Sequence, residues 1–295
     1  MTPDPLDPPF EILAPAPDIA AAPVVFNSPH SGARYPAPFL AATRLDALTL
    51  RRSEDAFVDE LFLPAVGLGA PLMRAHFPRA FLDVNREPYE LDPRMFEGRL
   101  PADANTRSLR VAGGLGTIAR VVGDAQEIYA GRLPVGEALG RIEALYKPYH
   151  ASLRRLLDDM RRRFGAVLLV DCHSMPSTGL PRDEARRADI VLGDRYGTSC
   201  APFITDRAEQ ALRALGFAVM RNRPYAGGYI TEHYGSPAGG LHALQIEINR
   251  ALYMDEARHE RGPGFAALQA ALAGFLGPFI AFVAAELGPL RWAAE

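Results

Sequence analysis

Cysteine is nearly absent from the chain, which has only Cys172 and Cys200 among its 295 residues. Two cysteines are too few for a disulfide framework, and their separation does not match the paired spacing of a zinc ribbon or of a CxxC redox motif. A reducing compartment is therefore favoured, and we expect a cytoplasmic protein. The N-terminal segment carries acidic residues and prolines where an export signal needs a basic region and an unbroken apolar stretch, so no export is expected.

An excess of charge of either sign is also lacking. The formal net charge is −3, and 23% of the residues are charged, which is ordinary for a soluble globular protein. The clearest positive cluster runs from Arg161 to Arg163, but Asp158 and Asp159 lie beside it on an expected solvated helix face. The composition thus predicts no nucleic-acid partner and no charged membrane surface as partner.

Only one apolar run raises the question of a membrane span, and it lies between Phe265 and Leu287. Gln269 and Pro278 interrupt this run, and no basic cluster flanks it closely. We interpret it as a buried C-terminal helix and expect no membrane partner. The number of subunits is left open by the sequence.

Short apolar segments alternate with segments of helical periodicity along the chain. The expected strands lie at 24–26, 70–73, 80–84, 166–170, 190–192, 217–220 and 244–248, and the expected helices at 54–66, 139–160, 206–215 and 265–287. This alternation predicts an α/β fold, with one mixed, mostly parallel sheet flanked by helices on both faces.

The expected domain organisation is simple. Residues 1–20 are rich in Pro and Asp and are expected to form an irregular N-terminal arm, and residues 21–295 are expected to form a single catalytic domain. The segment from about 94 to 124 has little periodicity, so we expect a long surface loop that could cover a site.

Polar residues follow three of the expected strands. His30 follows the first strand, Asn85 and Arg86 follow the strand at 80–84, and His173 follows the strand at 166–170. Ligands of open α/β sheets bind beyond the carboxyl ends of the strands, so these side chains are expected to converge. Two histidines and one carboxylate form a donor set that binds zinc and keeps a position for water. Taken singly, each motif is more often structural than metal-binding.

The carboxylate of such a set is either Glu54 or Asp55, and the residues alone leave the two open. Both stand at the expected start of a helix, where the helix dipole favours acids without any metal. Asp171 precedes His173 by two positions and fits either a capping acid or the acceptor that fixes the orientation of a metal-bound histidine.

Glu247 lies on the polar face of the expected strand at 244–248. A buried carboxylate is costly unless it is paired or used, which makes Glu247 a candidate base. The alternative is an edge strand that leaves Glu247 in water, and the two interpretations are equally supported.

Several residues are candidates for substrate binding. Arg79 and Arg86 suit a carboxylate because a guanidinium offers two parallel donors, although surface ion pairing is the more usual role of an arginine. Gly228 permits close backbone approach, so the segment that continues to Thr231 is either a substrate-facing loop or a plain tight turn.

Eight short blocks share their order with one known family between residue 24 and about residue 256. They are NSPHSG from Asn27, EDAFVDELF from Glu54, LDVNR from Leu82 with Arg79 upstream, DCHS from Asp171, LGDRYGTSC from Leu192, GGYIT from Gly227 with Asn222 upstream, YGSP from Tyr234 and HALQIEIN from His242. Together they resemble the N-formylglutamate amidohydrolase family, and their collinearity is far more specific than any single motif. The resemblance implies a zinc carboxypeptidase-like α/β fold.

The resemblance also implies three groups of site residues. The metal ligands are His30, Asp55 and His173, for one divalent metal that is expected to be zinc. The catalytic residues are Glu247, as general base, and Arg79, which could polarise the scissile carbonyl. The substrate-binding residues are Asn85, Arg86, Asn222, Gly228 and Thr231.

The implied reaction is metal-assisted hydrolysis of an N-acyl amino acid. By resemblance the substrate is N-formyl-L-glutamate, which gives formate and L-glutamate in histidine degradation. Two alternatives stand beside it: a metallocarboxypeptidase-like hydrolase of another N-acyl amino acid or short peptide, with a wider cleft, and a non-catalytic binding protein on the same fold. His30, His173 and Glu247 together argue against the binding protein, because a scaffold needs none of them.

Overall fold

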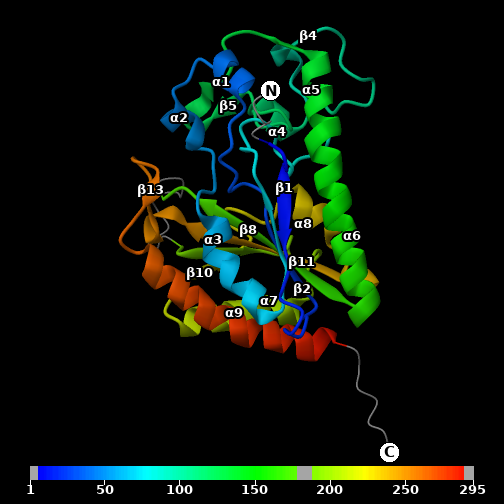
Figure 1. Ribbon diagram of the computed structural model, residues 1–295, viewed down its shortest axis with the longest axis vertical. Coiled ribbons are helices and arrows are strands. Elements are labelled where there is room, and N and C mark those ends of the chain that lie inside the picture. Colours follow the sequence, from blue (N-terminus) through cyan, green and yellow to red (C-terminus); the bar gives the residue numbers. More distant parts are fainter. Residues whose placement is uncertain (1–5, 178–187, 289–295) are drawn as a thin grey trace, which may run out of the picture.

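The computed structural model describes residues 6–177 and 188–288. Its centre is a seven-stranded sheet in the order β1-β3-β2-β8-β11-β9-β10 (Figure 1). The strands are β1 (Phe10–Leu13), β2 (Val24–Ser28), β3 (Leu72–Ala75), β8 (Val167–Met175), β9 (Ile190–Gly193), β10 (Val219–Arg221) and β11 (Leu241–Asn249). Four neighbouring pairs are parallel, whereas β1 with β3 and β9 with β11 are antiparallel. The expected mixed and mostly parallel sheet is confirmed.

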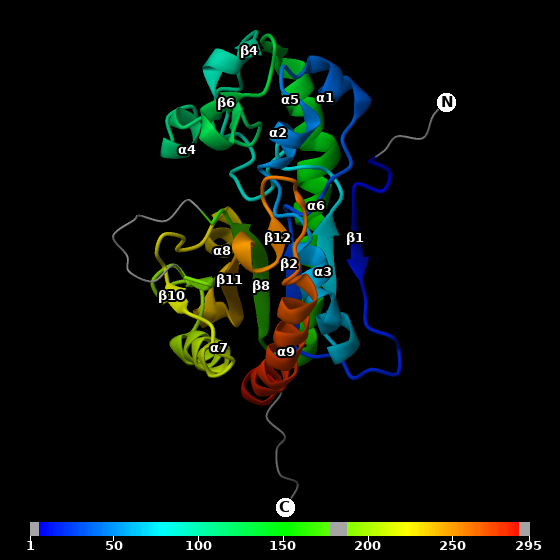
Figure 2. The same ribbon diagram turned by 90° about the vertical axis from the view of Figure 1, so that its left-hand side faces the viewer.

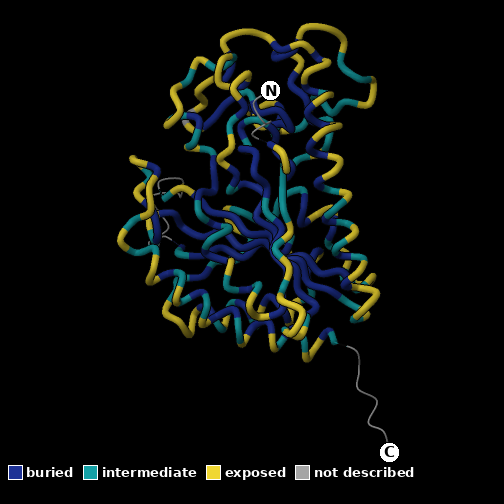
Figure 3. The backbone as a smooth tube through the Cα atoms, viewed as in Figure 1, coloured by how far each residue is buried: buried dark blue, intermediate teal, exposed yellow. Residues whose placement is uncertain are grey.

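Helices cover both faces of the sheet. Leu169 of β8 belongs to a core on one face with α6 (Lys147–Phe164) and α8 (Tyr229–Tyr234), whereas Leu168 and Val170 belong to the opposite core. The helices of that opposite core are α3 (Val58–Phe62), α7 (Pro202–Ala214) and α9 (Phe265–Leu287) (Figure 2). Successive strand residues point to opposite faces, so apolar runs such as β8 supply both cores. Figure 3 shows the central strands of the sheet as buried.

The apolar C-terminal segment forms α9, as expected. By length and composition alone, this helix could cross a membrane. In its most apolar stretch, 39% of the residues are buried. It packs against α3 and α7, and Leu272, Phe275 and Phe279 are buried in the core of that face. Its apolar character is therefore explained by packing on the sheet.

A second layer of short elements lies beyond the carboxyl ends of the central strands, and we call it the cap. It consists of α1 (Ala37–Ala42), α2 (Ala47–Arg51), η2 (Pro93–Met95), β4 (Phe96–Glu97), α4 (Leu109–Ala112), β5 (Val121–Val122), η3 (Gly123–Ala125), β6 (Gln126–Glu127), β7 (Leu133–Pro134) and α5 (Val135–Arg141). The π-helix η4 (Ile142–Tyr146) continues α5 into α6, so one long helical segment joins the cap to the sheet (Figure 1). The expected helix at 139–160 is thus confirmed in extended form.

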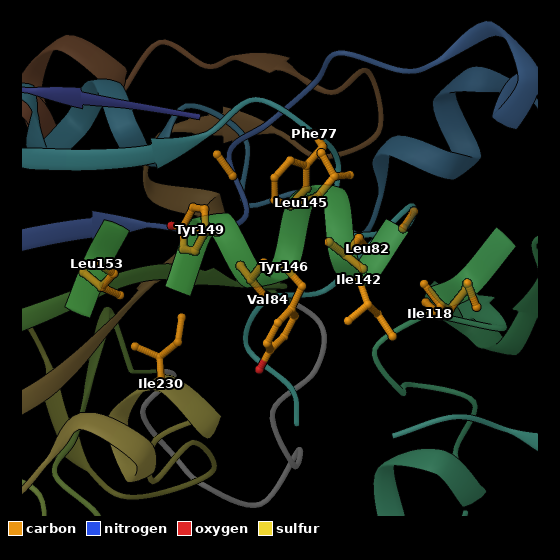
Figure 4. Close-up of a cluster of buried hydrophobic side chains, with 14 of the residues drawn as sticks. Phe77, Leu82, Val84, Ile118, Ile142, Leu145, Tyr146, Tyr149, Leu153 and Ile230 are labelled. Carbon is orange, nitrogen blue, oxygen red and sulfur yellow. The ribbon is translucent and has the colours of Figure 1, made fainter. Parts of the chain in front are cut away.

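The segment from 94 to 124 is irregular and near the surface over 98–108, as its low periodicity predicts, but other parts of it are packed. It contributes Ile118 and Val122 to the same core that contains Leu82, Ile142 and Tyr146 (Figure 4). Its elements are only a few residues long, which is too short for a hydrophobic period to be visible in the sequence. Packing against the long helix, rather than local propensity, holds it in place.

Three other expectations about local structure are wrong. The N-terminal arm contains the strand β1, whose Glu11 pairs with Arg74 of β3, because its prolines lie outside Phe10–Leu13. Residues 80–84 are buried except for Phe81, and they turn instead of forming a strand, since the backbone amide of Phe81 donates to the carbonyl oxygen of Pro78 at 2.9 Å. The helix expected from Glu54 begins only at Val58, because Phe57 has a φ of 65°.

The remaining elements complete the chain. They are η1 (Leu63–Leu68), η5 (Pro237–Gly239), η6 (Arg250–Leu252), β12 (Met254–Asp255) and β13 (Glu260–Arg261). The expected strands at 190–192 and 244–248 and the helix at 206–215 correspond to β9, β11 and α7.

Candidate active site

A cavity of about 600 Å³ lies between the carboxyl ends of the central strands and the cap. His173 of β8 and Glu247 of β11 line it from the sheet side, and Arg110 of α4 and Val121 of β5 line it from the cap side. The segment that we expected to cover a site therefore does line this cavity. The position agrees with the general location of ligand sites in open α/β sheets.

Two histidines and one carboxylate meet at the bottom of this cavity. The Nδ1 atoms of His30 and His173 lie 3.3 Å and 2.9 Å from Oδ2 of Asp55. All three side chains are buried, and one ligand atom from each lies within 4.8 Å of the others. Glu54, the other candidate carboxylate, points elsewhere and accepts hydrogen bonds from Tyr35 and His259. The structure thus brings Asp55, and not Glu54, to the histidines.

The outer nitrogens of both rings are held by carboxylates. Nε2 of His30 lies 2.7 Å from Oδ1 of Asp83, and Nε2 of His173 lies 2.9 Å from Oδ2 of Asp171. Metal-bound histidines are oriented in this way, with the second ring nitrogen bonded to a carboxylate. Asp171 therefore occupies the position expected of such an acceptor, and Asp83 performs the same task for His30.

A second observation indicates that His30, Asp55 and His173 fit a divalent metal ion. Among the described residues, Nδ1 of His30 is buried and makes no hydrogen bond, although Oδ2 of Asp55 is near. A buried polar atom without a partner is costly. Two imidazole nitrogens and a carboxylate oxygen are donors that zinc binds well, and a cation at this position would satisfy the unpaired nitrogen.

The acids of the site are stabilised in the charged state by their neighbours. Burial raises the pKa of Asp55, but the hydrogen bond from His173 and the nearby imidazole of His30 outweigh it and hold the pKa well below its usual range. Burial opposes ionisation of Asp83 in the same way, and the charges of Arg79 and Arg86 outweigh it. Both carboxylates are therefore charged at neutral pH.

Glu247 lies beside this group, but its pKa is shifted in the opposite direction. Burial raises its pKa to about 7, since the nearby charges of His173 and Arg79 offset only part of the desolvation. Its strand is interior, with β8 and β9 paired on its two sides, so the edge-strand interpretation is wrong. A buried carboxyl group with a pKa near neutrality is typical of a general base.

Gln245 fixes the carboxyl group of Glu247. Its Nε2 donates to Oε1 of Glu247 at 2.9 Å, and its Oε1 accepts from the backbone amide of Gly228 at 2.7 Å. Gly228 must be glycine because a Cβ there would lie 2.4 Å from Nδ2 of Asn85. Asn85 in turn lies 3.2 Å from Nε2 of His173 and accepts from the backbone amide of Ile230. One network thus connects the glycine loop, the base and a histidine.

The cavity carries a surplus of positive charge. Its lining contains five arginines and three carboxylates, namely Arg52, Arg79, Arg86, Arg110, Arg250, Asp55, Asp83 and Glu247. Burial lowers the pKa of Arg86, and the charges of Arg79 and Arg110 lower it further while Asp83 opposes them. Guanidinium groups that repel one another in a buried site are stabilised by an anionic ligand.

Two expected binding residues do not reach the cavity. Asn222 donates to Oδ1 of Asp194 at 2.8 Å, and Thr231 is buried with its hydroxyl 3.4 Å from Oε1 of Gln245. Neither belongs to the lining, which contains Gly228, Asn85, Arg86 and Arg79. In this structure Asn222 and Thr231 support the loop instead of facing the cavity.

Sequence reasoning missed some residues of the site. Asp83 and Gln245 could have been found, because Asp83 lies in the same block as Asn85, and Gln245 shares the polar face of Glu247. Arg250, whose Nη2 donates to Oδ1 of Asp55 at 3.1 Å, and Arg110 carry no local signal. Their positions depend on the fold alone.

Comparisons with known proteins identify a matching family and similar sequences. The family model described as N-formylglutamate amidohydrolase matches residues 22–254. The N-formylglutamate deformylase of Pseudomonas putida is 32% identical over 237 residues, which cover 79% of this chain and 82% of the relative. The N-formylglutamate deformylase of Pseudomonas aeruginosa is 30% identical and covers 79% and 83%.

Solved structures give the same answer. The crystal structure of N-formylglutamate amidohydrolase from Ralstonia eutropha JMP134 matches with a TM-score of 0.88 and 39% identity, over 93% of this chain and 98% of that one. The gene product Atu2144 from Agrobacterium tumefaciens shares the fold, with a TM-score of 0.65, 20% identity and 94% of both chains covered. With the family model matched over most of the sequence, the chain belongs to the N-formylglutamate amidohydrolase family.

Proposed function

We propose that this protein hydrolyses N-formyl-L-glutamate to formate and L-glutamate, and that the reaction depends on one bound divalent metal ion. The observation that carries the proposal is the meeting of His30, Asp55 and His173 beside Glu247, in a cavity with a surplus of arginines. The activities of the curated relatives, as their names give them, support the choice of substrate.

The metal ligands of this proposal are His30, Asp55 and His173. A divalent ion held by them would supply Lewis acidity to a water molecule and to the carbonyl group of the substrate. Zinc is the expected ion because it accepts two imidazoles and a carboxylate and keeps a position open. Asp83 and Asp171 hold the two imidazole rings in the orientation that turns Nδ1 toward Asp55.

Glu247 is the general base and then the general acid. Its carboxylate takes a proton from the attacking water as the water oxygen bonds to the formyl carbon. The same proton passes to the amide nitrogen as the carbon–nitrogen bond breaks, which releases formate and the amine of glutamate. Gln245 keeps Oε1 of Glu247 in place through a bond of 2.9 Å. Arg79, which lines the cavity and bonds to Asp83, supports the negative charge that develops on the carbonyl oxygen.

The substrate is a dianion, and the cavity is matched to that charge. Arg86 lies at one wall with its Nε bonded to the carbonyl oxygen of Leu115, and Arg110 of the cap faces the same space. We assign the two carboxylates of the substrate to these arginines, since charge-assisted hydrogen bonds to guanidinium groups give both affinity and orientation. Asn85 adds a polar contact beside Arg86.

The cap argues against the peptidase alternative. Its residues Leu115, Val121 and Val122 line the cavity opposite the histidines, so a long peptide has less room than a small N-acyl amino acid. We place the reaction in the cytoplasm, a choice that the two buried, unpaired cysteines support. Histidine degradation is the expected metabolic setting.

The test combines metal content with product formation. Purified protein is analysed for metals, and formate release from N-formyl-L-glutamate is measured before and after chelation and metal return. About one ion per chain with formate release that chelation abolishes supports both parts. Metal without formate release overturns the substrate assignment, and full activity in chelated, metal-free protein overturns the metal dependence. N-formyl-L-leucine, which lacks the second carboxylate, serves as the matched control substrate.

A further inference from the structure

A second, smaller pocket lies in the cap, outside the catalytic cavity. Its volume is about 190 Å³, and its lining contains four arginines and one carboxylate. The arginines are Arg44, Arg94, Arg120 and Arg132, and the carboxylate is Glu127. None of these residues lines the catalytic cavity. Nothing in the proposed reaction uses them.

The guanidinium groups of this pocket are held in place by the protein. Nε of Arg44 donates to the carbonyl oxygen of Tyr129 at 2.9 Å, and Nη2 of Arg132 donates to the carbonyl oxygen of Pro93 at 3.1 Å. The Nη2 atom of Arg94 and the Nε atom of Arg120 both bond to Oδ2 of Asp92, at 2.8 Å and 2.9 Å. A preorganised donor loses less side-chain entropy when it binds a ligand.

The negative charges near the pocket are shared and do not balance the arginines. Asp92 serves both Arg94 and Arg120, and Glu127 lies 3.2 Å from Arg120 and 3.6 Å from Arg44. Among the described residues, Arg132 pairs with no carboxylate and has only a carbonyl partner. Four guanidinium groups thus face two carboxylates, which leaves a net positive charge of two for an anionic ligand to neutralise.

We propose that this pocket is a binding site for a small doubly charged oxyanion of the phosphate or dicarboxylate type. Planar guanidinium forks match the oxygen pairs of both groups, and the pocket is large enough for only a small molecule. The site does not rest on the proposed reaction, because none of its residues takes part in it.

The pocket shares a wall with the catalytic cavity. Arg120 lies in the pocket, while its neighbours Ala119 and Val121 line the cavity. Val121 of β5 is paired with Glu127 of β6, so the same small hairpin faces both spaces. An anion bound to Arg120 and Arg132 therefore stabilises this hairpin, and its backbone amides exchange hydrogen more slowly.

The experiment measures binding of inorganic phosphate by calorimetry to the full-length protein, at constant ionic strength with chloride as the compensating anion. The test variant is Arg132→Gln, which removes one surface guanidinium, and Arg162→Gln on α6 is the control for loss of an exposed arginine. Arg86→Gln reports phosphate held in the catalytic cavity. Thermal unfolding of each variant verifies that it folds.

We expect phosphate binding at the cap pocket to weaken at least about tenfold in Arg132→Gln and to be unchanged in Arg162→Gln, whereas Arg86→Gln changes only phosphate held in the catalytic cavity. Hydrogen exchange should show protection of residues 121–128 by phosphate in the wild type and not in Arg132→Gln. Binding that Arg132→Gln leaves unchanged, or that only Arg86→Gln removes, overturns the proposal. A parallel titration with succinate separates the two ligand types: tighter succinate binding assigns a dicarboxylate, and tighter phosphate binding assigns a phosphate.

Discussion

Asp83 and His30 form the shortest contact to a histidine of the His30, Asp55 and His173 group, with Oδ1 of Asp83 2.7 Å from Nε2 of His30. The same carboxylate accepts from Nη2 of Arg79 and from the backbone amide of Asn85, each at 2.8 Å. It therefore sets the position of a ligand, of a candidate catalytic arginine and of a candidate substrate-binding residue. A single buried carboxylate thus holds three parts of the site in place.

The first prediction follows from this arrangement. Asp83→Asn keeps the size of the side chain but removes the charge that orients His30, so we expect metal affinity to fall about 10- to 100-fold. Competition with a chromogenic chelator measures the affinity. Asp194→Asn, which changes a buried carboxylate away from the cavity, is the control. Equal affinity in wild type and Asp83→Asn would show that Asp83 does not support the ligand.

A pair of variants separates the ligand from the base. His173→Ala should lose bound metal and turnover together, because one of the three donors is gone. Glu247→Gln should retain the metal while kcat falls by about 10²- to 10⁴-fold, because the proton acceptor is lost. Elemental analysis and formate release measure both quantities in each variant. Wild-type turnover in either one contradicts the proposed roles.

The sequence specified the sheet and the central group of the site better than it specified the cap. Short apolar runs, 24–26 and 166–170, precede His30 and His173, as in strands buried on both faces, so the position of each histidine toward the carboxyl end of a strand could be inferred. The expected end of the second strand at residue 170 was wrong, because β8 continues through His173 to Met175. Glu247 could be placed on a strand by alternation. Whether that strand was interior could not, because sheet order depends on contacts distant in the sequence.

The positions of other site residues could not be predicted from the local sequence either, because they also depend on contacts distant in the sequence. Asp55 and Glu54 are neighbours with the same chemistry, and only the tertiary fold decides which one faces the histidines. Arg110 reaches the cavity through a four-residue helix that has no readable period. Tertiary packing, not propensity, creates these positions.

Substrate recognition by Arg86 leads to a third prediction. Arg86→Ala removes a buried guanidinium from the cavity wall, so we expect KM for N-formyl-L-glutamate to rise about 10- to 100-fold with a smaller change in kcat. Steady-state kinetics measure both constants. Arg162→Ala, on the exposed face of α6, is the matched control and should leave both unchanged. An unaltered KM in Arg86→Ala would remove this residue from the carboxylate site.

The buried state of Glu247 also predicts how stability depends on pH in metal-free protein. Burial raises the pKa of Glu247 from its ordinary 4.5 to about 7. As pH rises from 4.5, the unfolded chain releases this proton first, while the folded protein keeps it until about pH 7. The folded state is therefore destabilised progressively over that interval, and the full cost is present above pH 7. This cost is at most about 3 to 4 kcal/mol, because one unit of pKa difference corresponds to about 1.4 kcal/mol.

Glu247→Gln removes the ionisable group and with it this cost. In the presence of chelator we expect the variant to have a higher Tm than the wild type at pH 8, and the difference to shrink to a small fraction at pH 5, where folded wild-type Glu247 is protonated. Thermal unfolding at several pH values measures the difference. Glu143→Gln, which alters an exposed glutamate paired with Lys147, is the control and should show no such trend. A gain in Tm that is the same at pH 5 and pH 8 would mean that the variant stabilises the protein by packing and not by removing a buried charge. A gain confined to high pH means that this protein keeps a carboxyl group in its core at the expense of stability, as is expected of a residue retained for catalysis.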